Sequence, residues 1–331
     1  MGITMDELAA LAKVSQGAVS LVLNGKAAGQ ISQKKQELIL RLAREHNYRV
    51  NMAAKVLRKQ RQYVVGVIMP ASLNPFYASM MTLLQRFLMQ RSYMPLFTFL
   101  SAEFGIEKIY NSLYGRHVDG IISWESSPEM FRDGIPMVFF QENTRRGETG
   151  FPESGRFCRC GFDYASSFGE LYARLYALGH RRIGFIGIPE DPRCRMLVAF
   201  LDARGGECVC FPYHDSMTGD SEFFDAVFDM PERPTALVTT NDETARQLIS
   251  AGYRRGIRFP QDISVTGFMD LPFARSMFPA LTTVDSRNEK LAEVMVGSML
   301  GLIEKPDLPV EDTFIKTELV IRDSCGPVPE G

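Results

Sequence analysis

Short, continuous apolar runs alternate with helix-like segments through residues 62–331, and this alternation constrains the fold more than any other feature of the sequence. The apolar runs cover 63–70, 94–100, 118–123 and 135–140, and then 183–187, 236–240 and 263–268. Apolar residues at helical spacing occupy 75–91, 106–114 and 165–178. Uninterrupted apolar strands separated by helices are typical of parallel sheets that are covered on both faces. The two sets therefore predict an α/β body of two lobes, in which ligands bind at the carboxyl ends of the strands.

The first fifty residues have a different pattern, that of short helices. Thr4–Glu7 is a capping box that opens a helix ending near residue 13. Ser15 is a second N-cap, and its helix stops at the Asn-Gly pair at 24–25, a typical C-terminal signal. A third helix is expected over 32–46. Two short helices joined by about three residues form a helix-turn-helix, so we expect an all-α N-terminal headpiece.

The charge of the chain is divided unevenly between these two regions. Residues 1–61 contain eleven Lys or Arg and four Asp or Glu, which gives this segment +7, whereas the remainder carries −9. A compact basic segment on an acidic body indicates a polyanion as partner of that segment alone. By charge alone, a basic surface that is merely solvated explains the excess equally well.

The second helix favours the polyanion interpretation. Its face opposite Val19 and Val22 carries small or polar residues and one leucine, which are Gln16, Gly17, Ser20 and Leu21. In a recognition helix these residues would meet base edges in the major groove, where glutamine can pair with adenine and leucine can only touch a thymine methyl group. A plain three-helix bundle is the alternative. The basic excess and the small residues together make DNA binding the preferred hypothesis.

The headpiece resembles that of the lactose/galactose repressor (LacI/GalR) family. The resemblance rests on residues 4–9, 14–20 and 23–25, and on 46–51 followed by 54–58, which are similar to the family's linker and hinge helix. It implies that the partner is double-stranded DNA with a pseudo-palindromic operator. The implied DNA contacts are Thr4, Ser15, Gln16, Gly17, Ser20, Leu21, Asn24, Asn51, Ala54 and Leu57.

Two departures from the family pattern limit what can be transferred from it. Leu57 matches the leucine that wedges into the minor groove, a contact that works by bending the DNA. However, Val50 replaces the family's usual proline before the hinge asparagine. Leu21 stands where many members have an arginine that reads guanine. The operator preference of better-known members therefore does not carry over.

The body resembles the same family at 74–77, 118–122, 178–187, 281–284 and 318–324. This implies a periplasmic-binding-protein-like body of parallel sheets, with three crossovers between lobes near 161, 286 and 317. The expected domains are a headpiece over 1–50, a hinge helix or linker over 51–61 and an effector-binding and dimerisation domain over 62–331. Within it, the first lobe is about 62–160 and 287–316, and the second is about 161–286 and 317–325. Because no leucine-heptad tail follows Ser324, we expect a homodimer.

The resemblance also implies where a small-molecule effector binds. Arg195 matches a family arginine that typically grips sugar hydroxyls or a carboxylate, and a guanidinium suits two oxygens together; its alternative is a surface helix arginine. The remaining expected contacts are Phe76, Trp124, Gln141, Asn241, Asp242, Met269 and Asp270. The aromatic pair could equally pack within a lobe. Met269 and Gln141 replace acids usual in the family, so a sugar, a glycoside and a non-sugar effector all stay open.

Several function classes are disfavoured. The four histidines are scattered, and no zinc-protease, nucleophile-elbow, Walker or complete dinucleotide motif occurs, so we expect no enzyme. The six cysteines lack zinc-site spacing, so we expect reduced thiols, no metal and no cofactor. No apolar run is long enough for a membrane span, and the acidic N-terminus is unlike a signal peptide, which predicts a cytoplasmic protein with no membrane partner. The rival hypothesis is a solute sensor whose head needs a corepressor or has lost specific DNA binding.

Overall fold

The computed structural model describes residues 3–23, 27–46, 48, 61–141, 151–152, 155–214, 221–307 and 311–329. The chain divides into two compact units, Met1–Gln62 and Tyr63–Gly331, which are described separately below. Within the described ranges, no helix combines the length and the apolar character that crossing a bilayer requires.

The described residues of the first unit form a head of three helices. Its helices are α1 (Met5–Leu11), α2 (Gln16–Leu23) and α3 (Gln33–Glu45). The predicted capping box is present, because the Glu7 amide donates to the Thr4 hydroxyl at 3.2 Å and the Thr4 amide donates to the Glu7 carboxylate at 2.7 Å. α1 ends at Leu11, two residues before the predicted end. The head core is a small apolar cluster: Leu8, Ala9, Ala12, Val19, Val22, Ala27, Ile39 and Ala43.

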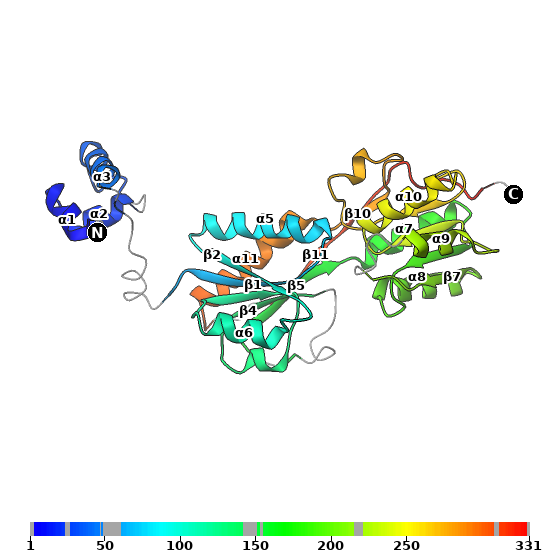
Figure 1. Cartoon of the computed structure of the whole chain (residues 1–331), viewed down its shortest axis with the longest axis horizontal. Helices are drawn as coiled ribbons and strands as arrows, with labels where there is room; N and C mark the ends of the chain where they lie inside the picture. The colour runs from blue at the N-terminus through cyan, green and yellow to red at the C-terminus, as the bar shows by residue number, and fades with distance from the viewer. Residues whose placement is uncertain are drawn as a thin grey trace. The chain divides into compact units, whose positions relative to one another are not determined.

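The second unit contains two parallel sheets, as predicted from the sequence (Figure 1). The first lobe is built on a six-stranded sheet of order β11-β5-β4-β3-β1-β2. Its strands are β1 (Val64–Pro70), β2 (Met94–Leu100), β3 (Gly120–Ser123), β4 (Met137–Phe140), β5 (Phe157–Asp163) and β11 (Thr313–Lys316). Helices α5 (Pro75–Gln90) and α11 (Asn288–Glu304) cover one face, and α6 (Ile106–Tyr114) covers the other with a short 3-10 helix, η1 (Pro128–Phe131).

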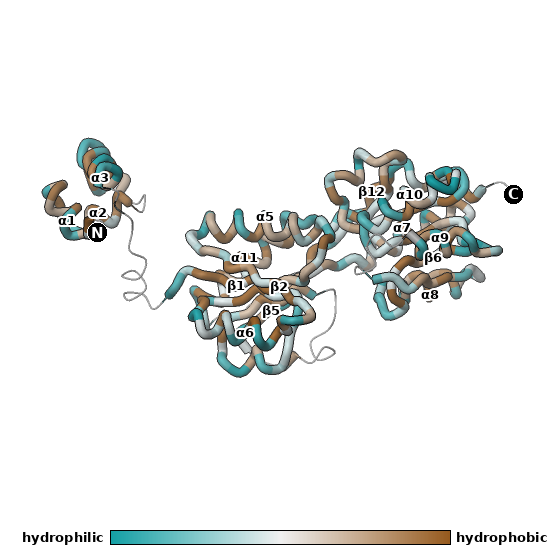
Figure 2. The backbone as a smooth tube through the Cα atoms, in the orientation of Figure 1, coloured by the Kyte–Doolittle hydropathy of each residue, from teal (hydrophilic) through white to brown (hydrophobic). Residues whose placement is uncertain are grey.

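The second lobe is built on a four-stranded sheet of order β7-β6-β8-β9. Its strands are β6 (Arg182–Ile186), β7 (Glu207–Phe211), β8 (Ala236–Thr239) and β9 (Ser264–Thr266). Its helices are α7 (Ala165–Ala177), α8 (Pro192–Asp202), α9 (Ser221–Phe228), α10 (Asp242–Arg254) and the 3-10 helix η3 (Ala274–Ser276). In Figure 2 the strands of both sheets are mainly apolar, as expected of sheets buried on both faces.

Two short antiparallel strands complete the body. β10 (Thr283–Asp285) pairs with β12 (Glu318–Val320), so two segments that lead between the lobes lie side by side. One boundary from the sequence is corrected. The second strand set was expected to begin near Gly161, but β5 continues through Asp163 as a strand of the first sheet, paired with β4 and β11. The local sequence at 157–163 is compatible with a strand of either sheet. Its pairing with β4 and β11 assigns it to the first sheet.

Candidate DNA-contact surface and ligand sites

The exposed side of α2 borders an open hollow of about 510 Å³ in the head. The residues around it are Met5, Ser15, Gln16, Gly17, Ala18, Ser20, Leu21, Gln30 and Ile31. Five of the residues expected to contact DNA therefore share one surface. The sixth described one, Thr4, is exposed and uses its hydroxyl to cap α1. Asn24, Asn51, Ala54 and Leu57 lie outside the described residues.

Packing within the head does not explain the small residues of this surface. A Cβ atom added to Gly17 would meet nothing closer than the Ser15 hydroxyl at 3.8 Å, an ordinary contact. Leu21, in contrast, is half-buried and packs partly against the head core, so only part of its side chain is available to a partner. On the helix side, this surface thus carries small side chains with one long polar side chain, Gln16, at the start of α2.

In the first lobe, the carboxyl ends of three strands bring aromatic side chains together. Trp124 follows β3 and stacks on Phe140, the last residue of β4, with ring centroids 5.4 Å apart. Tyr77 meets Trp124 edge-on at 6.4 Å. Phe76, which is buried at the start of α5, lies 6.2 Å from Phe140. Phe162, near the end of β5, lies 5.4 Å from Phe140. We call these five residues the aromatic wall.

Gln141 extends the aromatic wall by one residue beyond Phe140. Its backbone amide donates to the Cys160 carbonyl at 2.9 Å, which holds the end of β4 against β5. Close approach is possible because residue 161 is a glycine: a Cβ there would lie 1.7 Å from the Gln141 carbonyl oxygen. Two buried polar atoms in this region have no hydrogen-bond partner among the residues that the structure describes, the indole nitrogen of Trp124 and the amide oxygen of Gln141.

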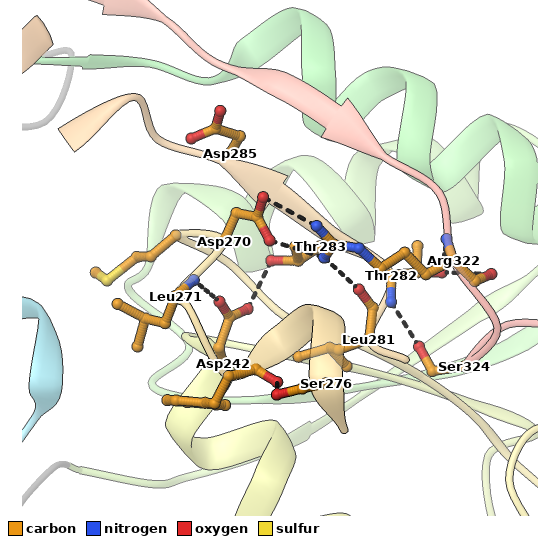
Figure 3. A network of polar contacts seen from close by, with 12 residues as sticks. Asp242, Asp270, Leu271, Ser276, Leu281, Thr282, Thr283, Asp285, Arg322 and Ser324 are labelled. Atoms are coloured by element: carbon orange, nitrogen blue, oxygen red, sulfur yellow. Dashed lines mark hydrogen bonds and ion pairs between the residues drawn. The ribbon is translucent and has the colours of Figure 1, made fainter. Parts of the chain in front are cut away.

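In the second lobe, Asp242 lies at the start of α10 and is fully buried (Figure 3). Its carboxylate accepts from the Leu271 amide and from the Thr283 hydroxyl, each at 2.6 Å. Gly267 allows this approach, because a Cβ there would lie 2.1 Å from the carboxylate. Burial raises the pKa of Asp242 to about 7, and although the two hydrogen bonds oppose the rise, they do not cancel it. Asp242 therefore holds the loop at 269–272 in place.

The neighbouring expected contacts also have partners within the lobe. Asn241 caps α10, since its side-chain oxygen accepts from the Thr244 amide at 2.9 Å. Asp270 forms an ion pair with Arg322 at 2.7 Å (Figure 3). Met269 and Asp270 both have positive φ angles, 107° and 46°, a conformation that costs non-glycine residues energy and that surrounding contacts must maintain. Both residues border a hollow of about 690 Å³ whose other side is α5 and the start of α11.

Two arginines of α8 have opposite surroundings. Arg195, the expected ligand contact, is exposed. Arg193 is buried: it donates to the Asp191 carboxylate at 2.6 and 3.0 Å and to the Thr240 carbonyl at 2.8 Å. Its guanidinium lies 4.9 Å from the centroid of the Phe268 ring. The buried guanidinium is thus neutralised inside the lobe, and Arg195 takes no part in this cluster.

Apart from the exposed Arg195, the expected ligand contacts form two groups rather than one. Phe76, Trp124 and Gln141 belong to the first lobe, and Asn241, Asp242, Met269 and Asp270 to the second. Phe162 and Phe268 connect them, with ring centroids 5.6 Å apart. Sequence reasoning did not select Tyr77, Phe140, Phe162, Phe268, Arg193 and Arg322. Most of these lie within two residues of a strand's carboxyl end, a signal that was available in the sequence.

Comparisons with known proteins match both units. The model of bacterial regulatory proteins, lacI family, matches residues 4–51, and the periplasmic binding protein-like domain matches 172–325. The ribose operon repressor of Escherichia coli (strain K12) is 28% identical, over 97% of this chain and 99% of its own length. The HTH-type transcriptional repressor CytR of the same strain is 24% identical, over 98% of this chain and 97% of its own length.

Solved structures agree on the fold. The transcriptional regulator CelR in complex with cellobiose has a TM-score of 0.65 at 25% identity, covering 97% of this chain and 99% of that one. The lac repressor dimer bound to operator and the anti-inducer ONPF has a TM-score of 0.76 at 20% identity, covering 98% of this chain and 99% of that one.

A helix-turn-helix head that precedes a two-lobed body of the periplasmic-binding-protein type defines a class of DNA-binding transcriptional regulators. Both units of this chain match the corresponding models, and its curated relatives align over nearly its full length. The chain belongs to the lacI family of bacterial regulatory proteins.

Proposed function

We propose that this protein is a transcriptional repressor whose affinity for its operator is controlled by a small-molecule effector bound in the body. The observation that carries the proposal is the surface of α2, where Ser15, Gln16, Gly17, Ser20 and Leu21 border one open hollow in a basic head. Small side chains let a helix approach base edges closely, and phosphate contacts from Lys and Arg supply the sequence-independent part of the affinity. The ribose operon repressor and CytR, both repressors by name, are similar over nearly the whole chain.

The effector site of the proposal consists of the aromatic wall with Gln141, together with Arg195 and the second-lobe group Asn241, Asp242, Met269 and Asp270. Solved relatives hold ribose, cellobiose and the anti-inducer ONPF, so a sugar or a sugar derivative is the expected ligand class. An effector shifts operator affinity only by its differential affinity for two states of the protein. Coupling in such systems is typically about 1–3 kcal/mol.

A homodimer is part of the proposal, because a pseudo-palindromic operator reflects the two-fold axis of the protein. The strand β2 lies at one edge of the six-stranded sheet, where its backbone can pair or pack with another chain. Its exposed apolar residues Met94 (55%) and Phe99 (42%) give that edge the character of a subunit contact. The lac repressor relative is a dimer on its operator.

The test is a selection of the full-length protein against a random duplex DNA library at about 150 mM salt, where non-specific binding is suppressed. We expect enrichment of a near-palindrome with a flexible pyrimidine–purine step at its centre, and loss of enrichment for Gln16→Ala. Gln33→Ala, at an exposed position that starts α3, is the matched control. Folded, dimeric protein that enriches no sequence would refute the regulator proposal and favour a sensor whose head needs a corepressor.

A further inference from the structure

The aromatic wall presents a half-buried apolar surface. Phe76 (2% exposed) and Phe162 (0%) form its buried back, whereas Tyr77, Trp124 and Phe140 are each only half-buried. The rings form one connected set, since each lies between 5.2 and 6.4 Å from at least one other member. Half-buried rings at the carboxyl ends of parallel strands offer a flat apolar ligand a large contact area.

Two polar atoms beside this surface require a partner. The Trp124 indole N–H is a donor, the Gln141 amide oxygen is an acceptor, and both are buried without a hydrogen-bond partner among the described residues. An unsatisfied buried polar group costs about 1–3 kcal/mol. A ligand that accepts from Trp124 and donates to Gln141 removes both costs, so the pair favours a molecule with one group of each kind.

Charged groups near the aromatic wall are neutralised or solvated. Arg193 is paired with Asp191, and Asp270 is paired with Arg322. The carboxyl of Glu125, next to Trp124, is exposed, and desolvation by burial raises its pKa. Gln141 itself is uncharged. Apart from the exposed Arg195, these surroundings oppose a charged ligand, because a buried charge without a partner is strongly unfavourable.

We propose that the effector is an uncharged molecule with a planar ring, which stacks on the aromatic wall, accepts a hydrogen bond from Trp124 and donates one to Gln141. The inference rests on the proposed effector function and narrows its ligand from sugars in general to compounds that carry such a ring. A free sugar fits less well. It presents several hydroxyl groups, most of which would lose their bonds to water against these rings.

Trp124 is the chain's single tryptophan. Fluorescence excited at the long-wavelength edge of tryptophan absorption, where tyrosine does not absorb, therefore reports on the aromatic wall alone. The experiment titrates full-length protein with uridine and, separately, with ribose; uridine carries the uncharged planar uracil ring, with its C=O and N–H groups, in place of the anomeric hydroxyl of the sugar. We expect saturable quenching by uridine with a Kd at least tenfold lower than that of ribose. Equal or tighter binding of ribose, or no response up to about 10 mM uridine, where even weak fragments bind, overturns the inference.

Two variants test the hydrogen bonds. Gln141→Leu removes the acceptor and is expected to weaken uridine about tenfold, which is about 1.4 kcal/mol, and to weaken ribose by a smaller factor. Gln261→Leu, at an exposed loop position, is its control. Trp124→Phe keeps a ring and removes only the N–H; measured by calorimetry, it is expected to weaken uridine by a similar factor. Unchanged uridine affinity in both variants overturns the assignment, and the Trp124→Phe result stands even if Gln141→Leu fails to fold.

The inference and the proposed function can fail separately. If the DNA selection yields an operator that ribose releases and uridine does not, the regulator stands and only the ligand class is refuted. If uridine binds at the aromatic wall but no sequence is enriched from the DNA library, the ligand class stands and the regulator proposal is refuted.

Discussion

Asp242→Asn is expected to flatten the pH dependence of the body's stability. In the folded protein, burial raises the pKa of the Asp242 carboxyl from 3.8 to about 7. Because the unfolded chain then releases its proton at lower pH than the folded one, the contribution is fully present below about pH 4 and is lost as pH rises through 7. The whole rise corresponds to about 4 kcal/mol, of which about 2–3 kcal/mol falls between pH 5 and pH 8.

Asparagine can keep both hydrogen bonds. Its side-chain oxygen can accept from the Leu271 amide, and its NH2 group can donate to the Thr283 hydroxyl, which rotates to accept. Because asparagine mimics the neutral acid, the variant is expected to exceed the parent's free energy of unfolding by about 1.5 kcal/mol at pH 5 and by about 4 kcal/mol at pH 8, a change of about 2–3 kcal/mol over this range. Urea unfolding at pH 5, 6, 7 and 8, followed by Trp124 emission, measures the difference.

Comparison of the parent with Asp242→Asn isolates the contribution of Asp242 to the pH dependence. His180 and Glu125 also have shifted pKa values, but they titrate in both proteins. Asp262→Asn is the control. The pKa of the half-buried Asp262 is lowered to about 2 by Arg258, so its stabilising effect is lost only in acid and the slope above pH 5 should not change. Parallel stability curves for parent and Asp242→Asn would show that the carboxylate is ionised in the fold and that its hydrogen bonds outweigh burial.

Three further predictions concern single substitutions, two of them with a matched partner variant. Arg193→Ala should destabilise the body by about 3–5 kcal/mol in urea unfolding, because the Asp191 carboxylate is left buried without its ion-pair partner. Arg195→Ala, at an exposed position, should cost under about 0.5 kcal/mol of stability and instead reduce the response of operator binding to effector. The reverse order of stability losses would contradict the assignment. Gly161→Ala should destabilise the body by about 2 kcal/mol or more, since the new Cβ would overlap the Gln141 carbonyl oxygen. Gly169→Ala, on α7 with open space around it, should stabilise the body by about 0.5–1 kcal/mol. Equal melting temperatures for the two variants would refute the packing argument. Met94→Glu should weaken the dimer in sedimentation experiments without unfolding the subunit, and an unchanged dimer would remove β2 from the subunit contact.

Local patterns in the sequence were sufficient for most of the architecture. The runs at 94–100 and 106–114 coincide with β2 and α6 because each segment has one clear periodicity and distinct boundaries, which for α6 are Gly105 and Gly115. Short strands such as β10 and β12 have no such signal. Each is three residues long and exists only because the other lies beside it.

The site was harder to predict, because charge pairing is a property of space. Arg193 and Arg195 are equivalent in sequence, at alternate positions of one helix start, and the position of Asp191 in the fold decides which one is buried. Similarly, Asp242 has the residue type of a ligand contact, but Gly267 and Thr283, which fix its surroundings, follow it by 25 and 41 positions. The aromatic wall was partly foreseen, since Phe76 and Trp124 follow strands whose carboxyl ends must meet.

The order of strands in the first lobe has a consequence for synthesis on the ribosome. β11 lies beside β5, and α11 packs on β3, β4 and β5, yet both elements come after the whole four-stranded sheet of the second lobe. Until residue 316 has emerged, the nascent first lobe lacks an edge strand and part of the cover on one face, whereas the four strands of the second sheet are complete at residue 266. Such exposed apolar surface promotes aggregation of incomplete chains. α11 and β11, which are synthesised late, therefore complete a lobe whose strand β1 is synthesised early. Premature termination near residue 300 should yield insoluble product.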